Sequence, residues 1–378
     1  MRISGSWDEL DDSGIGIYGK RKLNRERRGG FLFYGTSGRL IGDAFGVPYE
    51  FYRADELPGY EEIEMVPPAG FQKTYKDVEA GTWSDDGAQA LCLLDSLLRA
   101  GRFSLKDFSE SVSSWYEDGV WAVDGKVFDV GIQTANALNA YKKGGCPEEC
   151  GFLKPEGKGN GALMRVLPLV LWHNLCRGGE DRESLACGSD EGQDRGQAQG
   201  SRDRASGDSG SGSRDRDRQL VLDAHRQCLI THGNICNQVC CALYCLVASR
   251  LMDGLDARQA VGRGVADLRR IYEDMPEYKR SLEWSVRPDL PWQGQGTGYV
   301  VDCMRSAFMI LMEADSYEDG VKRAVLLGND TDNTACVLGG LSGILYGIQG
   351  IPGRWISMLR ERDKVEGLLG SLFNRAGE

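Results

Sequence analysis

Apolar residues recur every three to four positions in several stretches of the chain, which is the spacing of one buried face of an α-helix. Glycine and proline separate these stretches, and alternating patterns typical of β-strands are sparse. The pattern therefore predicts an all-α domain. The predicted helices are ALCLLDSLLRA (90–100), LVLDAHRQCLITH (220–232), NQVCCALYCLVASRLM (237–252), CMRSAFMILMEA (303–314) and the apolar part of LLGNDTDNTACVLGGLSGILYG (326–347).

Two polar segments interrupt this pattern. Residues 1–30 are polar and contain the basic run KRKLNRERR, so we expect a solvated, poorly ordered extension. Residues 177–219 have no aromatic residue and few large aliphatic ones, so they cannot bury enough surface to offset the entropy of ordering. We therefore expect one compact domain at 31–360, interrupted by a disordered insertion at 177–219 and followed by a C-terminal segment at 361–378.

Composition narrows the class of protein. The chain has 378 residues, of which 41% are hydrophobic, enough for a sizeable core. Its net charge of −11 makes it a poor binder of nucleic acid through the phosphate backbone, so no nucleic-acid partner is expected. No apolar run of 18 residues and no apolar leader are recognised, so we expect no membrane association and a cytoplasmic location.

The twelve cysteines lack the regular spacing of a disulfide framework. Several of them fall within the apolar helical patterns, where a cysteine packs as a small hydrophobic residue. We therefore expect reduced, buried thiols, as in other cytosolic proteins. These cysteines are Cys92, Cys236, Cys240, Cys241, Cys245 and Cys336.

Three acidic clusters lie at the ends of the predicted helices. They are GRLIGDAFGVPYEF (38–51) with Asp43 and Glu50, GTWSDDGAQALCLLDSLL (81–98) with Ser84, Asp85 and Asp86, and GNDTDN (328–333) with Asp330, Asp332 and Asn333. An aspartate before a helix is often only an N-cap. Neighbouring carboxylates beside a core are unfavourable unless a cation neutralises them, however, and hydroxyl and amide oxygens accompany these carboxylates. The second and third clusters together favour one or two hard cations, Mg²⁺ or Mn²⁺, held between them.

The first cluster has a simpler interpretation. Asp43 is expected to cap a helix or to pack locally. Glu50 follows Pro48, which prevents the helix from continuing, so Glu50 is expected in a loop.

Small residues recur every four positions after the third cluster, at Ala335, Gly339, Gly343 and Gly347. On a helix they form one smooth stripe that another backbone can approach closely. We expect this stripe to hold the turn at Asp330 against another helix, with the helix after Asp86 as the candidate.

Four segments, in this order, resemble the ADP-ribosylglycohydrolase family. They are GDAFGVPYEF (42–51), WSDDGAQAL (83–91), GNGALMRVLPL (159–169) and GNDTDNTACVLGGLSGILYG (328–347). THGN (231–234) and GIPGRW (350–355) are similar to further segments of the family. The resemblance covers roughly residues 31–360 apart from the insertion, and its strength lies in the shared order of motifs that are individually weak.

The resemblance implies a compact single-domain helical bundle with a binuclear Mg²⁺ or Mn²⁺ site. One metal would be held by Ser84, Asp85, Asp86 and Asp332, and the other by Asp330, Asp332 and Asn333, with Asp332 shared. Glu50 would move a proton near the scissile bond, and Asp85 and Asp86 would serve catalysis as well as the metal. Gly159, Asn160, Gly161, Met164 and His232 would contact ADP-ribose.

The chain departs from the family pattern at three positions where threonine is usual. Ser84 keeps the hydroxyl, Asn333 exchanges it for the carbonyl of a longer amide, and Gly87 is expected to loosen the start of its helix.

The implied function is metal-dependent hydrolysis of the glycosidic bond between ADP-ribose and an acceptor. The acceptor could be an arginine, a serine, another residue or a small molecule. One alternative is a non-catalytic ADP-ribose-binding or structural protein on the same fold. Another is a related hydrolase that acts on a different nucleotide or ribosyl compound, because a fold alone does not decide function.

Overall fold

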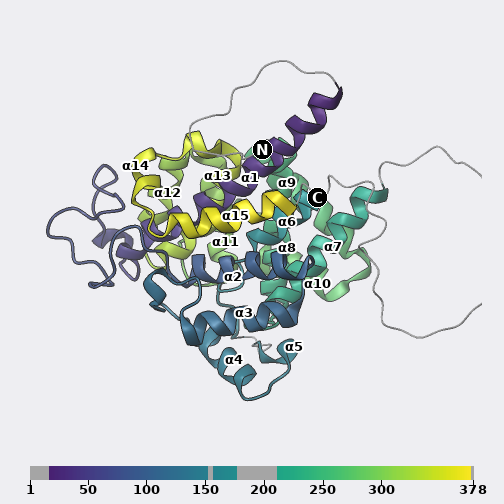
Figure 1. Ribbon diagram of the computed structural model, residues 1–378, viewed down its shortest axis with the longest axis horizontal. Coiled ribbons are helices and arrows are strands. Elements are labelled where there is room, and N and C mark those ends of the chain that lie inside the picture. The colour runs from purple at the N-terminus through teal and green to yellow at the C-terminus, as the bar shows by residue number, and fades with distance from the viewer. Residues whose placement is uncertain (1–16, 152–155, 177–210, 376–378) are drawn as a thin grey trace, which may run out of the picture.

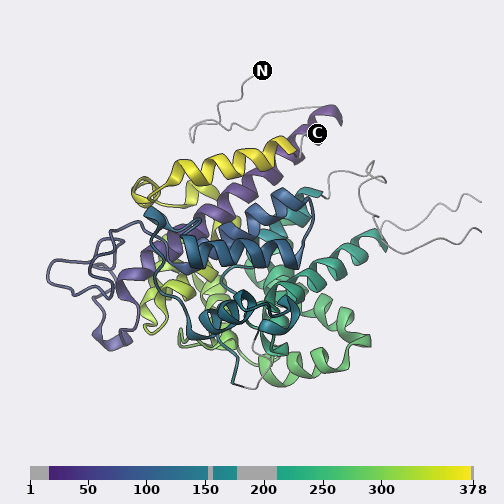
Figure 2. The same cartoon turned by 60° about the horizontal axis from the view of Figure 1, so that its bottom comes forward.

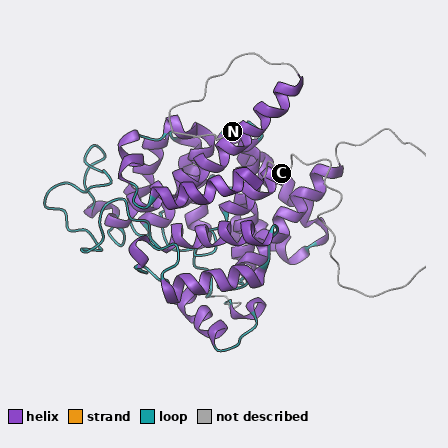
Figure 3. Cartoon of the chain, in the orientation of Figure 1, coloured by secondary structure: helices purple, strands orange, loops and turns teal. Residues whose placement is uncertain are grey.

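The computed structural model describes residues 17–151, 156–176 and 211–375. Within them the chain is built from helices and loops, and no β-strand is present (Figures 1 and 3). Pairs in the pattern of a β-bridge occur only in isolation, at Arg53–Gly328 and Gly159–Tyr299. The α-helices are α1 (Ile17–Gly46), α2 (Asp85–Ala100), α3 (Leu105–Asp118), α4 (Ile132–Lys142), α5 (Pro147–Cys150), α6 (Leu167–Cys176), α7 (Ser211–Cys228), α8 (Ile235–Met252), α9 (Ala257–Ile271), α10 (Pro276–Ser281), α11 (Val300–Glu313), α12 (Tyr317–Leu326), α13 (Thr331–Gly350), α14 (Gly353–Met358) and α15 (Arg362–Arg375).

The prediction of an all-α fold is confirmed. The stretches 90–100, 237–252 and 303–314 lie in α2, α8 and α11, and the apolar part of 326–347 forms α13. The stretch 220–232 belongs to α7, which ends at Cys228.

Two helices extend into segments interpreted as extension or insertion. Helix α1 begins at Ile17, so residues 17–30 are helical and continuous with the buried part of the same helix. Helix α7 begins at Ser211, so residues 211–219 are helical rather than disordered. Asp217 is buried there and pairs with the buried Arg250 of α8. The low apolar content of residues 211–219 gave no sign of this helix, because a long-range ion pair rather than apolar burial anchors it. Residues 1–16 and 177–210 lie outside the described ranges.

Helix α8 passes through the centre of the molecule. By length and composition it could cross a membrane, which corrects the expectation that the sequence holds no such run. Of this helix, 94% is buried within the protein, as in the core helix of a globular domain. The cysteines singled out in the sequence are buried, and the ten cysteines whose side chains are described are free thiols, as expected.

The closest helix packing joins α1 to α13, at opposite ends of the chain (Figure 1). A Cβ added at Gly42 would lie 2.1 Å from the Ala335 carbonyl oxygen, and one at Gly339 would lie 2.4 Å from the Gly38 carbonyl oxygen. The stripe of small residues on α13 therefore packs as predicted, but its partner is α1 rather than the helix after Asp86. At Gly347 the backbone leaves the helical conformation, with φ of 70°.

Replacing Gly42 with alanine should destabilise the protein by about 3 kcal/mol, because a backbone atom blocks the added methyl group and neither helix can yield. Chemical denaturation measures the change in the free energy of unfolding. Gly262→Ala is the matched control: Gly262 lies within α9 with open space around it, so alanine should stabilise by about 0.5–1 kcal/mol. Equal effects of the two substitutions would contradict the close packing.

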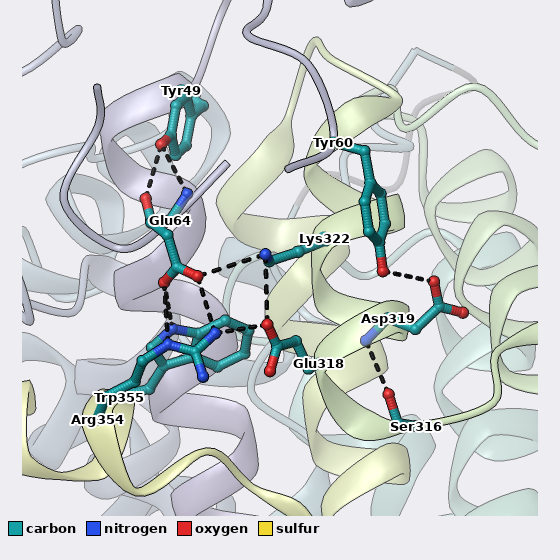
Figure 4. Close-up of polar contacts among 9 residues, drawn as sticks. All are labelled: Tyr49, Tyr60, Glu64, Ser316, Glu318, Asp319, Lys322, Arg354 and Trp355. Atoms are coloured by element: carbon teal, nitrogen blue, oxygen red, sulfur yellow. Dashed lines mark hydrogen bonds and ion pairs between the residues drawn. The ribbon is translucent and has the colours of Figure 1, made fainter. Parts of the chain in front are cut away.

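A long loop follows Tyr49 and projects from one end of the molecule in both views (Figures 1 and 2). Glu64 anchors this loop to two helices. Its carboxylate lies between the buried Lys322 of α12 and Arg354 of α14 and forms an ion pair with each (Figure 4). Glu64 also accepts a hydrogen bond from Trp355 Nε1 at 2.7 Å, and its carbonyl accepts one from the Tyr49 hydroxyl at 2.6 Å. This network fixes the backbone that leads into Glu50.

Candidate active site

The start of α2 is held from α1. Asp43 accepts hydrogen bonds from the backbone N–H of Ser84 at 2.9 Å and of Gly87 at 2.7 Å, so it caps α2 across the helix interface. The Ser84 hydroxyl is the N-cap and accepts from Asp86 N at 3.4 Å. A Cβ at Gly87 would lie 2.6 Å from Leu40 and 2.8 Å from Trp83. Gly87 therefore permits close packing at the start of α2.

The start of α13 faces that of α2. Its N-cap, Asp330, makes no side-chain capping bond. The Asp332 carboxylate accepts a hydrogen bond from Asn333 N at 2.8 Å. Glu50 lies after a short 3-10 turn, Val47–Tyr49, in the loop that the proline predicted. Its carbonyl accepts from the Thr74 hydroxyl at 2.5 Å.

Glu50 and Asp332 come together with a residue that sequence reasoning missed, Asp129. One oxygen of each of these three carboxylates lies within 4.8 Å of the other two. Asp129 stands in a loop, in KVFDVG, with no helical periodicity or paired carboxylate to single it out. The Tyr75 hydroxyl donates to it at 2.7 Å. Only the tertiary arrangement identifies Asp129.

Buried oxygen atoms converge here without hydrogen-bond partners among the described residues. Most buried acceptors in proteins are satisfied, so a group of unpartnered oxygens is typical of a ligand site. All of them are hard donors, which suit Mg²⁺ or Mn²⁺, and the residues present therefore fit such a cation. They are Glu50 Oε2, Asp86 Oδ1, Asp330 Oδ1, Asp332 Oδ2 and Asn333 Oδ1.

The pKa values of these carboxyls are raised, first by burial and then by one another. Burial together with Asp332 and Asp129 raises the pKa of Glu50 to about 12. Burial together with Asp332 raises the pKa of Asp330 to about 8. The pKa values of Asp85, Asp86 and Asp332 are raised for the same reasons. Such a cluster stays ionised at neutral pH only with a compensating positive charge.

The glycine loop, residues 159–161, contacts this cluster through Asn160. Asn160 donates from Nδ2 to the Asp330 carboxylate at 3.0 Å, which joins the loop to the start of α13. A Cβ at Gly161 would lie 2.6 Å from the His232 ring, so His232 lies against the loop. Burial lowers the pKa of His232 to about 3, so its imidazole is neutral. Met164 is buried in the core, and its carbonyl faces Cys336 of α13.

A buried chain of hydrogen bonds connects Asp85, in the second acidic cluster, with His232, beside the glycine loop. Gln89 Nε2 donates to Asp85 at 2.9 Å, and Arg165 donates to the Gln89 amide oxygen at 2.7 Å. Arg165 also donates to the Thr231 hydroxyl at 2.8 Å, and that hydroxyl lies 2.8 Å from His232 Nδ1. Arg165 therefore positions both an aspartate of the second cluster and the histidine beside the glycine loop.

Left-handed backbone occurs at three non-glycine residues around the carboxylates. The φ angles are 66° at Phe51, 55° at Asp129 and 62° at Asn329. Such conformations cost energy and persist where the surrounding structure enforces them, commonly at functional sites.

Several known proteins are similar to this chain. A family model described as ADP-ribosylglycohydrolase matches residues 35–190 and 210–378. The chain is 28% identical to an ADP-ribosylarginine hydrolase of Serratia proteamaculans, over 90% of this chain and 78% of that protein. It is 24% identical to an ADP-ribosyl-dinitrogen reductase glycohydrolase of Rhodospirillum rubrum, over 85% and 87% of the two chains. A solved structure, an ADP-ribosylglycohydrolase-related protein complex, aligns with a TM-score of 0.63 at 26% identity and covers 94% of this chain and 99% of its own. The chain therefore belongs to the ADP-ribosylglycohydrolase family of enzymes.

Proposed function

We propose that the protein is a metal-dependent hydrolase of the glycosidic bond between ADP-ribose and an acceptor. The observation that carries the proposal is the group of buried, unpartnered oxygens on Glu50, Asp86, Asp330, Asp332 and Asn333. These atoms come from the three acidic clusters and lie beside the glycine loop that the family resemblance assigns to ADP-ribose. The names of the relatives, which act on ADP-ribosylated substrates, agree with it.

The metal ligands would be Ser84, Asp85, Asp86, Asp330, Asp332 and Asn333. When bound, Mg²⁺ or Mn²⁺, in one or two ions, would supply Lewis-acid stabilisation and a template for the ribose hydroxyls and the attacking water. Asp43 and Arg165 contribute by positioning: Asp43 fixes the backbone of Ser84, and Arg165 acts on Asp85 through Gln89.

Glu50 is the residue best placed to move a proton. Its raised pKa of about 12 makes it a proton holder without a cation, and a bound cation would lower that value toward the range of a working acid or base. We propose that Glu50 exchanges a proton with water or the leaving group. A carboxylate oxygen of Asp129 lies within 4.8 Å of one of Glu50, and Asp129 accepts a hydrogen bond from Tyr75. Asp129 would hold the water on the acceptor side.

The glycine loop and His232 would hold ADP-ribose. The absence of side chains at Gly159 and Gly161 lets this backbone pack against the His232 ring, and Asn160 joins it to Asp330. Backbone N–H groups of such loops receive phosphate oxygens even in an acidic protein. Met164 would support this loop from the core, because its side chain is buried.

The first test is calorimetric titration of ADP-ribose into the purified protein with Mg²⁺ and then with EDTA. Binding that requires the metal would support the proposal, and assays of ADP-ribosylated substrates would follow. Tight binding with no turnover of any substrate would favour the non-catalytic alternative. No binding under either condition would reject the function while leaving the fold intact.

A further inference from the structure

We propose that the ring of Phe51 binds the acceptor side of the substrate and selects an acceptor with a planar cation, the guanidinium group of an arginine. This inference rests on the proposed function and adds to it a residue that determines specificity. Phe51 directly follows Glu50, yet the side chain of Glu50 is 3% exposed and that of Phe51 is 66% exposed. The chain thus turns one side chain into the site and the next one out at its edge.

The outward position of Phe51 is enforced by the backbone. Phe51 N donates to the Asn329 carbonyl at 2.6 Å, and Asn329 N donates to the Tyr52 carbonyl at 2.6 Å. Both Phe51 and Asn329 adopt left-handed backbone, which is uncommon for a bulky residue such as phenylalanine. A large apolar side chain is therefore kept exposed at a costly conformation beside the reacting groups. A ligand that covers the ring would bury its exposed apolar surface.

The surroundings of the ring indicate what that ligand carries. The ring centroids of Phe51 and Tyr75 lie 6.5 Å apart, and those of Tyr75 and Phe128 lie 5.0 Å apart. The hydroxyl of Tyr75 reaches Asp129, so this aromatic row leads from the exposed edge to the carboxylates. Aromatic faces attract cations, arginine most often, and neighbouring carboxylates reinforce the attraction. A serine acceptor offers neither charge nor plane, and an ester acceptor offers no charge.

Phe51 is distinct from the residues assigned to ADP-ribose. Its described contacts are with Tyr75 and with the 329 backbone, and none of them reaches the glycine loop or His232. The ring should consequently affect recognition of the acceptor and leave the affinity for ADP-ribose itself unchanged. That separation makes the inference testable apart from the overall function.

The experiment compares Phe51→Leu and Phe51→Tyr with the unmodified protein on ADP-ribosylated arginine and ADP-ribosylated serine, in the presence of Mg²⁺. The measured quantities are kcat/KM for each substrate and Kd for both substrates and for ADP-ribose. Leucine removes the π face and should lower kcat/KM for the arginine substrate by about threefold to thirtyfold, whereas tyrosine keeps the face and should restore it. The control is Trp284→Leu, which removes another exposed ring outside the site, 76% exposed. It should leave kcat/KM unchanged for both substrates.

The possible results separate the two proposals. Equal losses on both substrates, or a weaker Kd for ADP-ribose in Phe51→Leu, would assign the ring to ADP-ribose or to loop structure and overturn the inference. A preference of the unmodified protein for the serine substrate would overturn it while leaving the proposed function standing. If ADP-ribose and its conjugates bind without turnover, the hydrolase proposal fails, and the loss of affinity for the arginine conjugate alone in Phe51→Leu still decides the role of Phe51. If nothing binds, both proposals fall.

Discussion

Asp332→Asn should lower kcat/KM for an ADP-ribosylated substrate by roughly 10³-fold or more, while raising the melting temperature of the metal-free protein. The activity should fall because Asp332 is one of the proposed metal ligands, and the loss of several kcal/mol of charge stabilisation corresponds to a rate loss of this size. The stability rises because Asp332 is fully buried, with an orphaned oxygen, next to other carboxylates.

Opposite changes in activity and stability are the diagnostic feature of this variant. A substitution that simply unfolds the protein lowers both quantities. Asp319→Asn on α12 is the control of equal charge: its carboxylate pairs with Tyr60 and Arg323, away from the cluster, so activity should persist and stability should fall slightly. Retention of activity in Asp332→Asn would exclude Asp332 from the proposed metal site.

Removal of divalent metal should make the protein progressively less stable as the pH rises. Burial raises the pKa of Asp129 to about 6, of Asp43 to about 7 and of Asp330 to about 8, against about 4 in an unfolded chain. With these raised values the folded protein binds more protons than the unfolded one, so stability falls as the pH rises through this window. Melting temperatures in EDTA should therefore decrease between about pH 5 and about pH 8.

Added Mg²⁺ or Mn²⁺ should reverse this trend. Metal binding displaces protons from the carboxyls, so the increase in melting temperature on adding metal should be larger at the higher pH. Asp330→Asn removes one of the titrating groups and should flatten the profile in EDTA. A melting temperature that stays constant or rises with pH in EDTA would contradict the assignment of the cluster as a cation site.

The periodic helices and the acidic clusters could be predicted because both are local signals. Asp85 and Asp86 begin a strongly patterned helix. Asp332 lies just before the stripe of small residues, whose close packing the sequence predicts. The local sequence does not show which helix packs against the stripe. The stripe packs on α1 because the glycines of that helix lie in the same four-residue spacing, a match between segments that no window of the sequence contains.

The same limit explains the residues that were missed or misinterpreted. Asp129 is an isolated carboxylate in a loop and becomes notable only beside Glu50 and Asp332. Asp43 was expected to cap a helix or to pack locally; it does cap a helix, but one that begins about forty residues further on. The first turns of α7 looked too polar to order, and a buried partner on α8, Arg250, supplies their anchor.

The seam between α1 and α13 has a consequence for how the protein is made. Asp43 and Glu50 emerge early in synthesis, whereas the backbone against which α1 packs, from Asp332 to Gly343, is among the last parts of the domain to be translated. At about 5–20 residues per second, the early helix waits tens of seconds for its partner. During that interval its apolar face is uncovered, so the nascent chain should depend on chaperones, and truncations that remove α13 should yield aggregates rather than a smaller folded enzyme.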